Sequence, residues 1–210
     1  MANKLASEKL AGSEFFSEEN PMISARQLAL LACVLALASC ATPPPPAQLV
    51  SPPPAHKVSL SRGLSIPNPC GTVFATGIMQ IAEAVGEQTV SWCFAAAEAA
   101  QIAQAVRAGE IAEPVDLAGH SLGANAAQTI AHKLRDAGIR VGRVLLFDPT
   151  IDRDMTGFDA TEFMSRDWRA VPVTGATIQV RGDLDHLQIT TDPAVQAEAL
   201  KLLNKRRAAP

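Results

Sequence analysis

The sequence predicts an α/β protein, with a mainly parallel sheet of about five or six strands and helices on both faces. Short apolar runs alternate along the chain with longer runs of helical spacing, which is typical of parallel strands connected by helices. The apolar runs are continuous, as is expected of strands that are buried on both faces. With 210 residues, 48% of them hydrophobic and 19% charged, the chain is large enough for one such domain.

The expected elements follow one another from residue 56 to residue 204. Residues 72–86 repeat apolar side chains at helical spacing, and two Ala-rich helical runs end at Gly109 and Gly138. Strands are expected at 56–61, 89–94, 114–118, 143–147 and 177–181, and helices at 72–86, 95–108, 122–137 and 193–204. Residues 150–174, between the last two strands, are too many for a simple turn.

Composition excludes several classes of protein. The net charge of −3 disfavours nucleic acid as a partner, and 4% aromatic residues without tyrosine disfavour a platform for stacking bases. The four cysteines form no C-x-x-C pair and the four histidines are scattered, so neither a metal site nor a cofactor is predicted.

Residues 1–40 are expected to be an N-terminal extension and an export signal. Residues 28–39 are apolar, too short to span a bilayer, and preceded by Arg26. The ending Leu37–Ala38–Ser39–Cys40 resembles the lipobox of bacterial lipoproteins. This resemblance implies a lipid on Cys40, export to the bacterial cell envelope and a membrane anchor. Residues 1–21 are acidic where a signal is usually basic, so Met22 is the expected start; a signal anchor that stays uncleaved is the alternative.

Residues 41–55 are expected to be a linker. They contain seven of the fifteen prolines and favour an extended polyproline conformation that would span about 45 Å. The folded domain is therefore expected at 56–210.

The motif Gly119-His120-Ser121-Leu122-Gly123 fits the G-x-S-x-G nucleophile elbow. A serine at a strand-to-helix corner has a strained backbone, and the glycines remove side chains that would clash there. The following helix directs its first N–H groups towards the serine oxygen.

Three side chains fall at the ends of expected strands in the order Ser121, Asp148, His186. With the segments GHSLGA, LLFDPT and DHLQITTDPAVQAEAL, residues 57–205 resemble the α/β-hydrolases. The resemblance implies a serine nucleophile, a histidine base and an acid that orients the histidine. Asp183 and Asp185 remain alternatives to Asp148 as the acid.

The resemblance also implies an oxyanion hole and an activity. Leu122 would supply one N–H donor, and the loop after the first strand would supply the second, with Leu64 as candidate. Because acyl carriers are mainly cytoplasmic, export favours the cleavage of carboxylic esters of small molecules or lipids. An acyl thioesterase and a non-catalytic envelope lipoprotein that retains the fold are the alternatives.

Two further features concern the same edge of the expected sheet. In an exported protein Cys70 and Cys93 are expected to form a disulfide near the donor loop, the alternative being two buried small apolar residues. Cys33 lies in the signal.

The large apolar side chains of residues 150–174 could belong to a short helix over an acyl pocket or could pack the loop onto the domain; they are Phe158, Phe163, Met164 and Trp168. No lid is expected, so the site should be fairly open.

Overall fold

The computed structural model describes residues 54–63, 70 and 76–204, so the predicted signal and nearly all of the linker lie outside the described residues. The described residues form a six-stranded sheet in the order β2-β1-β3-β4-β5-β6, with every neighbouring pair parallel. The strands are β1 Ala55–Arg62, β2 Thr89–Ser91, β3 Ile111–His120, β4 Val141–Phe147, β5 Asp159–Ser165 and β6 Thr177–Arg181. The helices are α2 Thr76–Ala84, α3 Ala95–Arg107, α4 Leu122–Asp136 and α5 Pro193–Asn204, with short 3-10 helices η1 Trp92–Phe94 and η2 Gln188–Thr190. None of the helices in these ranges is long and apolar enough to cross a membrane.

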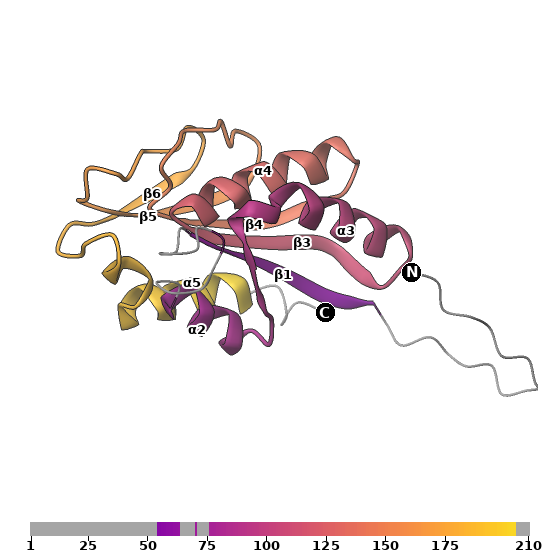
Figure 1. Cartoon of the computed structure of the whole chain (residues 1–210), viewed down its shortest axis with the longest axis horizontal. Helices are drawn as coiled ribbons and strands as arrows, with labels where there is room; N and C mark the ends of the chain where they lie inside the picture. Colours follow the sequence, from indigo (N-terminus) through magenta and orange to yellow (C-terminus); the bar gives the residue numbers. More distant parts are fainter. Residues whose placement is uncertain (1–53, 64–69, 71–75, 205–210) are drawn as a thin grey trace, which may run out of the picture. The chain divides into compact units, whose positions relative to one another are not determined.

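Helices cover both faces of the sheet, as the sequence predicts. Figure 1 shows α3 and α4 on one face and α2 and α5 on the other. Each face has its own apolar core, and neighbouring residues of one strand contribute to different cores: Leu145 packs on the side of α2 and α5, and Leu146 on the side of α3 and α4. Because β4 is buried on both faces, it appears in the sequence as a continuous apolar run.

Most elements lie where the sequence predicts them, with differences at their ends. Residues 89–94 are a strand only as far as Ser91, after which the chain turns into η1. Strand β3 runs beyond the expected residue 118 to His120, and α2 is described from Thr76. The longer β3 brings His120 and the start of the elbow to the carboxyl end of the sheet.

The expectation that residues 150–174 form one long connection is wrong. Residues 159–165 form β5, which lies between β4 and β6. The ring of Phe163 is fully buried and stacks on Phe147 with 5.0 Å between centroids. No helix forms anywhere between β4 and β6, a stretch that the structure describes throughout, and Trp168 is 87% exposed. The strand escaped prediction because its sequence, DATEFMS, has a buried glutamate opposite Leu146 of β4 and therefore lacks a continuous apolar run.

That glutamate, Glu162, is a carboxyl group buried inside the sheet. Its side chain has no exposed surface, and one oxygen accepts a hydrogen bond of 2.8 Å from the Val173 N–H. The other oxygen has no partner among the described residues. Burial raises the pKa of Glu162 to about 7, although the hydrogen bond from Val173 acts in the opposite direction. The folded protein therefore keeps this proton at a pH where an exposed glutamate has lost it.

Replacing Glu162 by glutamine is expected to stabilise the protein at pH 8 and to change its stability little at pH 4.5. The unfolded chain releases the proton near the ordinary value of 4.5 and the folded chain near 7, so the wild type loses stability as the pH rises through this interval. The expected gain at pH 8 is about 3 kcal/mol. Urea unfolding at a series of pH values measures it. Glu83→Gln, on an exposed position of α2, is the matched control. An equal pH dependence in wild type and Glu162→Gln would contradict the prediction.

Candidate active site

Ser121 lies at the sharp turn between β3 and α4. Its backbone has φ 57° and ψ −125°, a conformation that residues with a side chain rarely adopt and that stores strain. The Ser121 N–H donates a hydrogen bond of 2.9 Å to the carbonyl of Phe147, the last residue of β4, and the Ser121 carbonyl accepts one of 2.9 Å from Ala124. These bonds hold the strained serine at the carboxyl end of β3.

The two glycines of the motif are required by close backbone contacts. A Cβ on Gly119 would collide with the carbonyl of Gly123, and a Cβ on Gly123 would collide with the carbonyl of Ser61 on β1. The turn leaves no room for a side chain at either position, which accounts for the G-x-S-x-G spacing.

Asp148 follows β4 directly, and its buried carboxylate is surrounded by hydrogen-bond donors. The Ser165 N–H donates to Oδ1 at 2.6 Å and the Ser165 hydroxyl donates to Oδ2 at 2.6 Å. The Nδ1 of His186 lies 3.1 Å from the same Oδ2. The backbone of Asp148 has φ 45°, which turns the side chain at the end of the strand. The carboxylate is thus fixed against His186.

Ser165 is a site residue that the sequence analysis missed, because it ends the strand β5 that was not predicted. We expect Ser165→Ala to lower kcat by about tenfold to a hundredfold, since the buried carboxylate of Asp148 loses one charged hydrogen bond. Initial rates with p-nitrophenyl butyrate measure the effect. Ser165→Thr keeps the hydroxyl and should retain most of the activity; equal losses in both variants would contradict this role.

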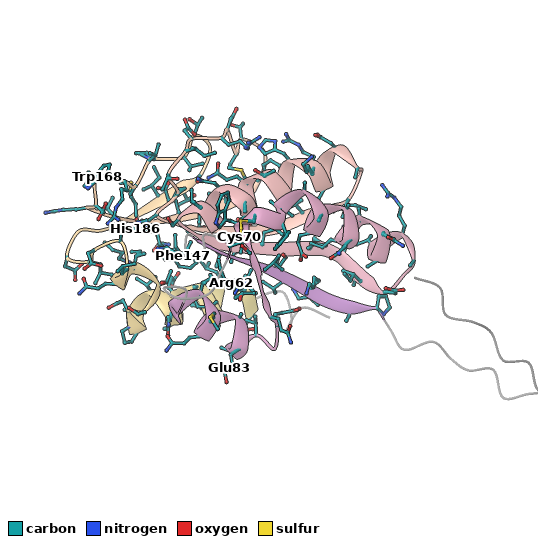
Figure 2. All side chains as sticks on the ribbon, in the orientation of Figure 1. Arg62, Cys70, Glu83, Phe147, Trp168 and His186 are labelled. Atoms are coloured by element: carbon teal, nitrogen blue, oxygen red, sulfur yellow. A yellow bond between two sulfur atoms is a disulfide. The ribbon has the colours of Figure 1, made fainter. Side chains whose placement is uncertain are left out.

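His186, labelled in Figure 2, comes from the loop after β6. Its imidazole is buried beside Asp148. Asp183 and Asp185, the other candidate acids, are exposed. The carboxylate of Asp185 accepts hydrogen bonds from the N–H groups of Leu187 and Gln188, at 2.8 Å each. Of the three aspartates, it is therefore Asp148 that pairs with His186.

His120, which precedes the serine, also packs on His186. The two ring centroids are 4.8 Å apart, and Nε2 of His120 lies 2.8 Å from the backbone carbonyl oxygen of His186. Burial, with His186 nearby, lowers the pKa of His120 to about 4. Through His120, the nucleophile turn and the histidine loop are in direct contact.

The structure describes one of the two expected oxyanion donors. Leu122 is the first residue of α4, so its N–H has no partner within the helix. Leu64 lies outside the described residues. Gly63, just before it, approaches the nucleophile: a Cβ on Gly63 would lie 3.0 Å from the Cβ of Ser121. The end of β1 therefore passes beside the serine.

Cys70 and Cys93 are joined by a disulfide. Cys93 lies in η1 after β2, and Cys70 lies in the connection after the neighbouring strand β1. The bridge ties together two connections at the carboxyl edge of the sheet. Cys33 and Cys40 lie outside the described residues.

The connection after β5 places a charged pair at the same edge. The Arg169 guanidinium donates two hydrogen bonds, of 2.7 and 2.6 Å, to the Asp167 carboxylate. This pairing holds the pKa of Asp167 well below its usual range. Trp168, between them in sequence, extends outwards from the molecule (Figure 2). In the described ranges, no three His, Cys, Asp or Glu side chains are grouped so that they could hold a metal ion.

The sheet and the elbow define the class of the protein. An ester-hydrolase from the metagenome of Lake Arreo has a similar fold, with a TM-score of 0.53 at 12% identity over 76% of this chain and 76% of that chain. An esterase from Pyrobaculum calidifontis has a TM-score of 0.52 at 12% identity over 74% of this chain and 78% of that chain. At such identities the likeness concerns the fold alone, and the fold is that of the α/β-hydrolases.

The family follows from the sequence comparison. A model of the thioesterase domain family matches residues 95–202, a stretch that contains Ser121, Asp148 and His186. The match covers just over half of the chain, and the chain belongs to the thioesterase domain family. No curated protein matches the sequence.

Proposed function

We propose that the protein hydrolyses carboxylic esters through an acyl-enzyme formed on Ser121. The observation that carries this proposal is the buried pair of Asp148 and His186, which lies against the same strand ends as the strained turn at Ser121. A serine hydroxyl is a weak nucleophile until a base takes its proton. The proposal assigns that role to His186 and the orientation of its imidazole to Asp148.

In the proposed reaction the Ser121 Oγ attacks the ester carbonyl and its proton moves to Nε2 of His186. The Leu122 N–H, together with an N–H from the loop after β1, donates to the oxyanion of the tetrahedral intermediate. The intermediate expels the alcohol, which takes the proton from His186 and leaves the acyl group on Ser121. Water then attacks the acyl group with His186 again as base, which releases the carboxylic acid and restores the hydroxyl.

Exposed apolar side chains at the carboxyl edge support an acyl substrate. They come from four different connections and are Phe94, Ile151, Trp168 and Leu187. If these side chains form one contiguous surface, it would suit the apolar part of an ester.

Labelling with a fluorophosphonate probe tests the proposal. The probe should form one adduct that maps to Ser121 by peptide mass, and Ser121→Ala should not be labelled. Absence of labelling in the folded wild type would reject the enzyme and favour a non-catalytic module that retained the fold.

Thioester hydrolysis is the second candidate, because the family model is that of a thioesterase domain. An ester and a thioester with the same acyl group would form the same acyl-Ser121, so they differ only in the acylation step. Comparing kcat/KM for p-nitrophenyl butyrate and the butyryl thioester of N-acetylcysteamine separates the two. If the protein is an esterase, kcat/KM divided by the uncatalysed rate should be larger for p-nitrophenyl butyrate than for the butyryl thioester.

We also propose that the protein is exported and anchored by a lipid on Cys40. The support is the apolar run at 28–39 with its Leu-Ala-Ser-Cys ending and the Pro-rich linker that follows. Mass spectrometry of the N-terminal peptide from the protein expressed in a bacterium tests this. A diacylglyceryl group on Cys40 is expected, and an unmodified Cys40 with residues 1–39 still attached would contradict it.

A further inference from the structure

His120 makes a contact that the proposed chemistry does not yet use. It is almost fully buried, and its Nε2 lies 2.8 Å from the carbonyl oxygen of His186. A carbonyl oxygen can only accept a hydrogen bond, so Nε2 of His120 carries the hydrogen. Burial also keeps the ring uncharged, because it lowers the pKa of His120 to about 4. His120 is therefore a neutral donor with one fixed tautomer over the working range of pH.

The topology shows why His186 needs such a contact. His186 follows the edge strand β6, whereas Ser121 follows β3, and the strands β4 and β5 lie between them. Three strand spacings amount to about 14 Å. The loop after β6 must cross this distance to bring the imidazole back to the serine.

Two residues hold His186 at two different points. Asp148, at the end of β4, binds Nδ1 of the imidazole. His120, at the end of β3 and next to the nucleophile, binds the backbone carbonyl. A ring held by Asp148 alone could still pivot with its backbone, whereas a ring whose backbone is also held has a defined position relative to Ser121.

We propose that His120 is a positioning residue, which fixes the main chain of His186 and thereby aims its imidazole at the Ser121 hydroxyl. The proposal rests on the proposed function of Ser121 and His186. Phenylalanine would fill the same space without a donor, and glutamine would keep an N–H donor at a similar reach. The two substitutions therefore separate packing from hydrogen bonding.

The experiment compares His120→Phe, His120→Gln and wild type on p-nitrophenyl butyrate. Active sites are first counted by labelling to completion with a fluorophosphonate, so that kcat is expressed per reactive serine. We expect kcat per site to fall about thirtyfold in His120→Phe, because a displacement of about 1 Å can lower a rate about a hundredfold. KM should stay within about twofold, and His120→Gln should recover most of kcat. His132→Phe, at a histidine on the far part of α4 that bonds to Asp154, is the matched control and should keep full activity.

Three outcomes would overturn the proposal. The first is an unchanged kcat per site in His120→Phe with fewer labelled sites, which would mean that His120 only supports folding. The second is a glutamine variant no better than the phenylalanine variant. The third is an equal loss in His132→Phe. If His120→Phe does not fold, His120→Met, which also lacks a donor, takes its place. A wild type that neither labels nor hydrolyses the ester would instead refute the proposed function, before any variant is compared.

Discussion

Replacing Ser121 by alanine is expected to lower kcat for p-nitrophenyl butyrate by about 10⁵-fold to 10⁶-fold. The variant lacks the oxygen that attacks the carbonyl, and no acyl-enzyme can form. What remains is the binding of the ester beside the oxyanion donors, which accelerates attack by water only weakly. Stopped assays over several hours, with the uncatalysed rate subtracted, measure the residual activity.

The fold of this variant is expected to be preserved. Alanine removes one atom from a side chain that has 9% of its surface exposed and leaves the backbone bond from residue 121 to the Phe147 carbonyl in place. The melting temperature should therefore change by no more than about 2 °C. Residual activity of a few per cent of wild type in the folded variant would show that another group is the nucleophile.

Replacing Asp148 by asparagine is expected to lower kcat by about 10⁴-fold while the protein still folds. A carboxylate at position 148 satisfies three donors, because its oxygens accept hydrogens from the N–H and hydroxyl of Ser165 and from Nδ1 of His186. An asparagine amide would place its own N–H₂ against one of these donors. His186 would then adopt the other tautomer, in which Nε2 carries the hydrogen and cannot take the proton of Ser121.

Asp183→Asn is the matched control for this prediction. It makes the same chemical change on an exposed aspartate of the histidine loop, three residues before His186. Its kcat should stay within about twofold of wild type. A large loss in Asp183→Asn with a small one in Asp148→Asn would assign the acid to the loop instead.

The sequence was sufficient for the parts of the site that depend on neighbouring residues. The elbow is encoded by five consecutive residues, and the two glycines are needed because Gly119 and Gly123 touch backbone within the turn and on β1. Asp148 was found because a polar residue directly follows an apolar strand. The resemblance to the α/β-hydrolases implied the pairing of Asp148 with His186, with Asp183 and Asp185 left as alternatives, and the parallel strands do end at the same edge.

The parts that escaped prediction depend on contacts between distant residues. Strand β5 has a glutamate at a buried position, and its apolar pattern is therefore interrupted. With the strand missed, Ser165 could not be placed beside Asp148, 17 residues earlier in the chain. The contact of His120 with His186 spans 66 residues and joins a side chain to a backbone carbonyl, for which no residue type gives a signal.

The two buried titratable groups have a joint consequence for the tolerance of acid. His120 takes up a proton only near pH 4 when folded but at 6.5 when unfolded, so its contribution to stability is lost as the pH falls from 6.5 towards 4. Glu162 changes stability in the reverse sense, with losses as the pH rises from 4.5 to about 7. Between about pH 4.5 and 6.5 the contributions of His120 and Glu162 to the pH dependence of stability therefore oppose each other.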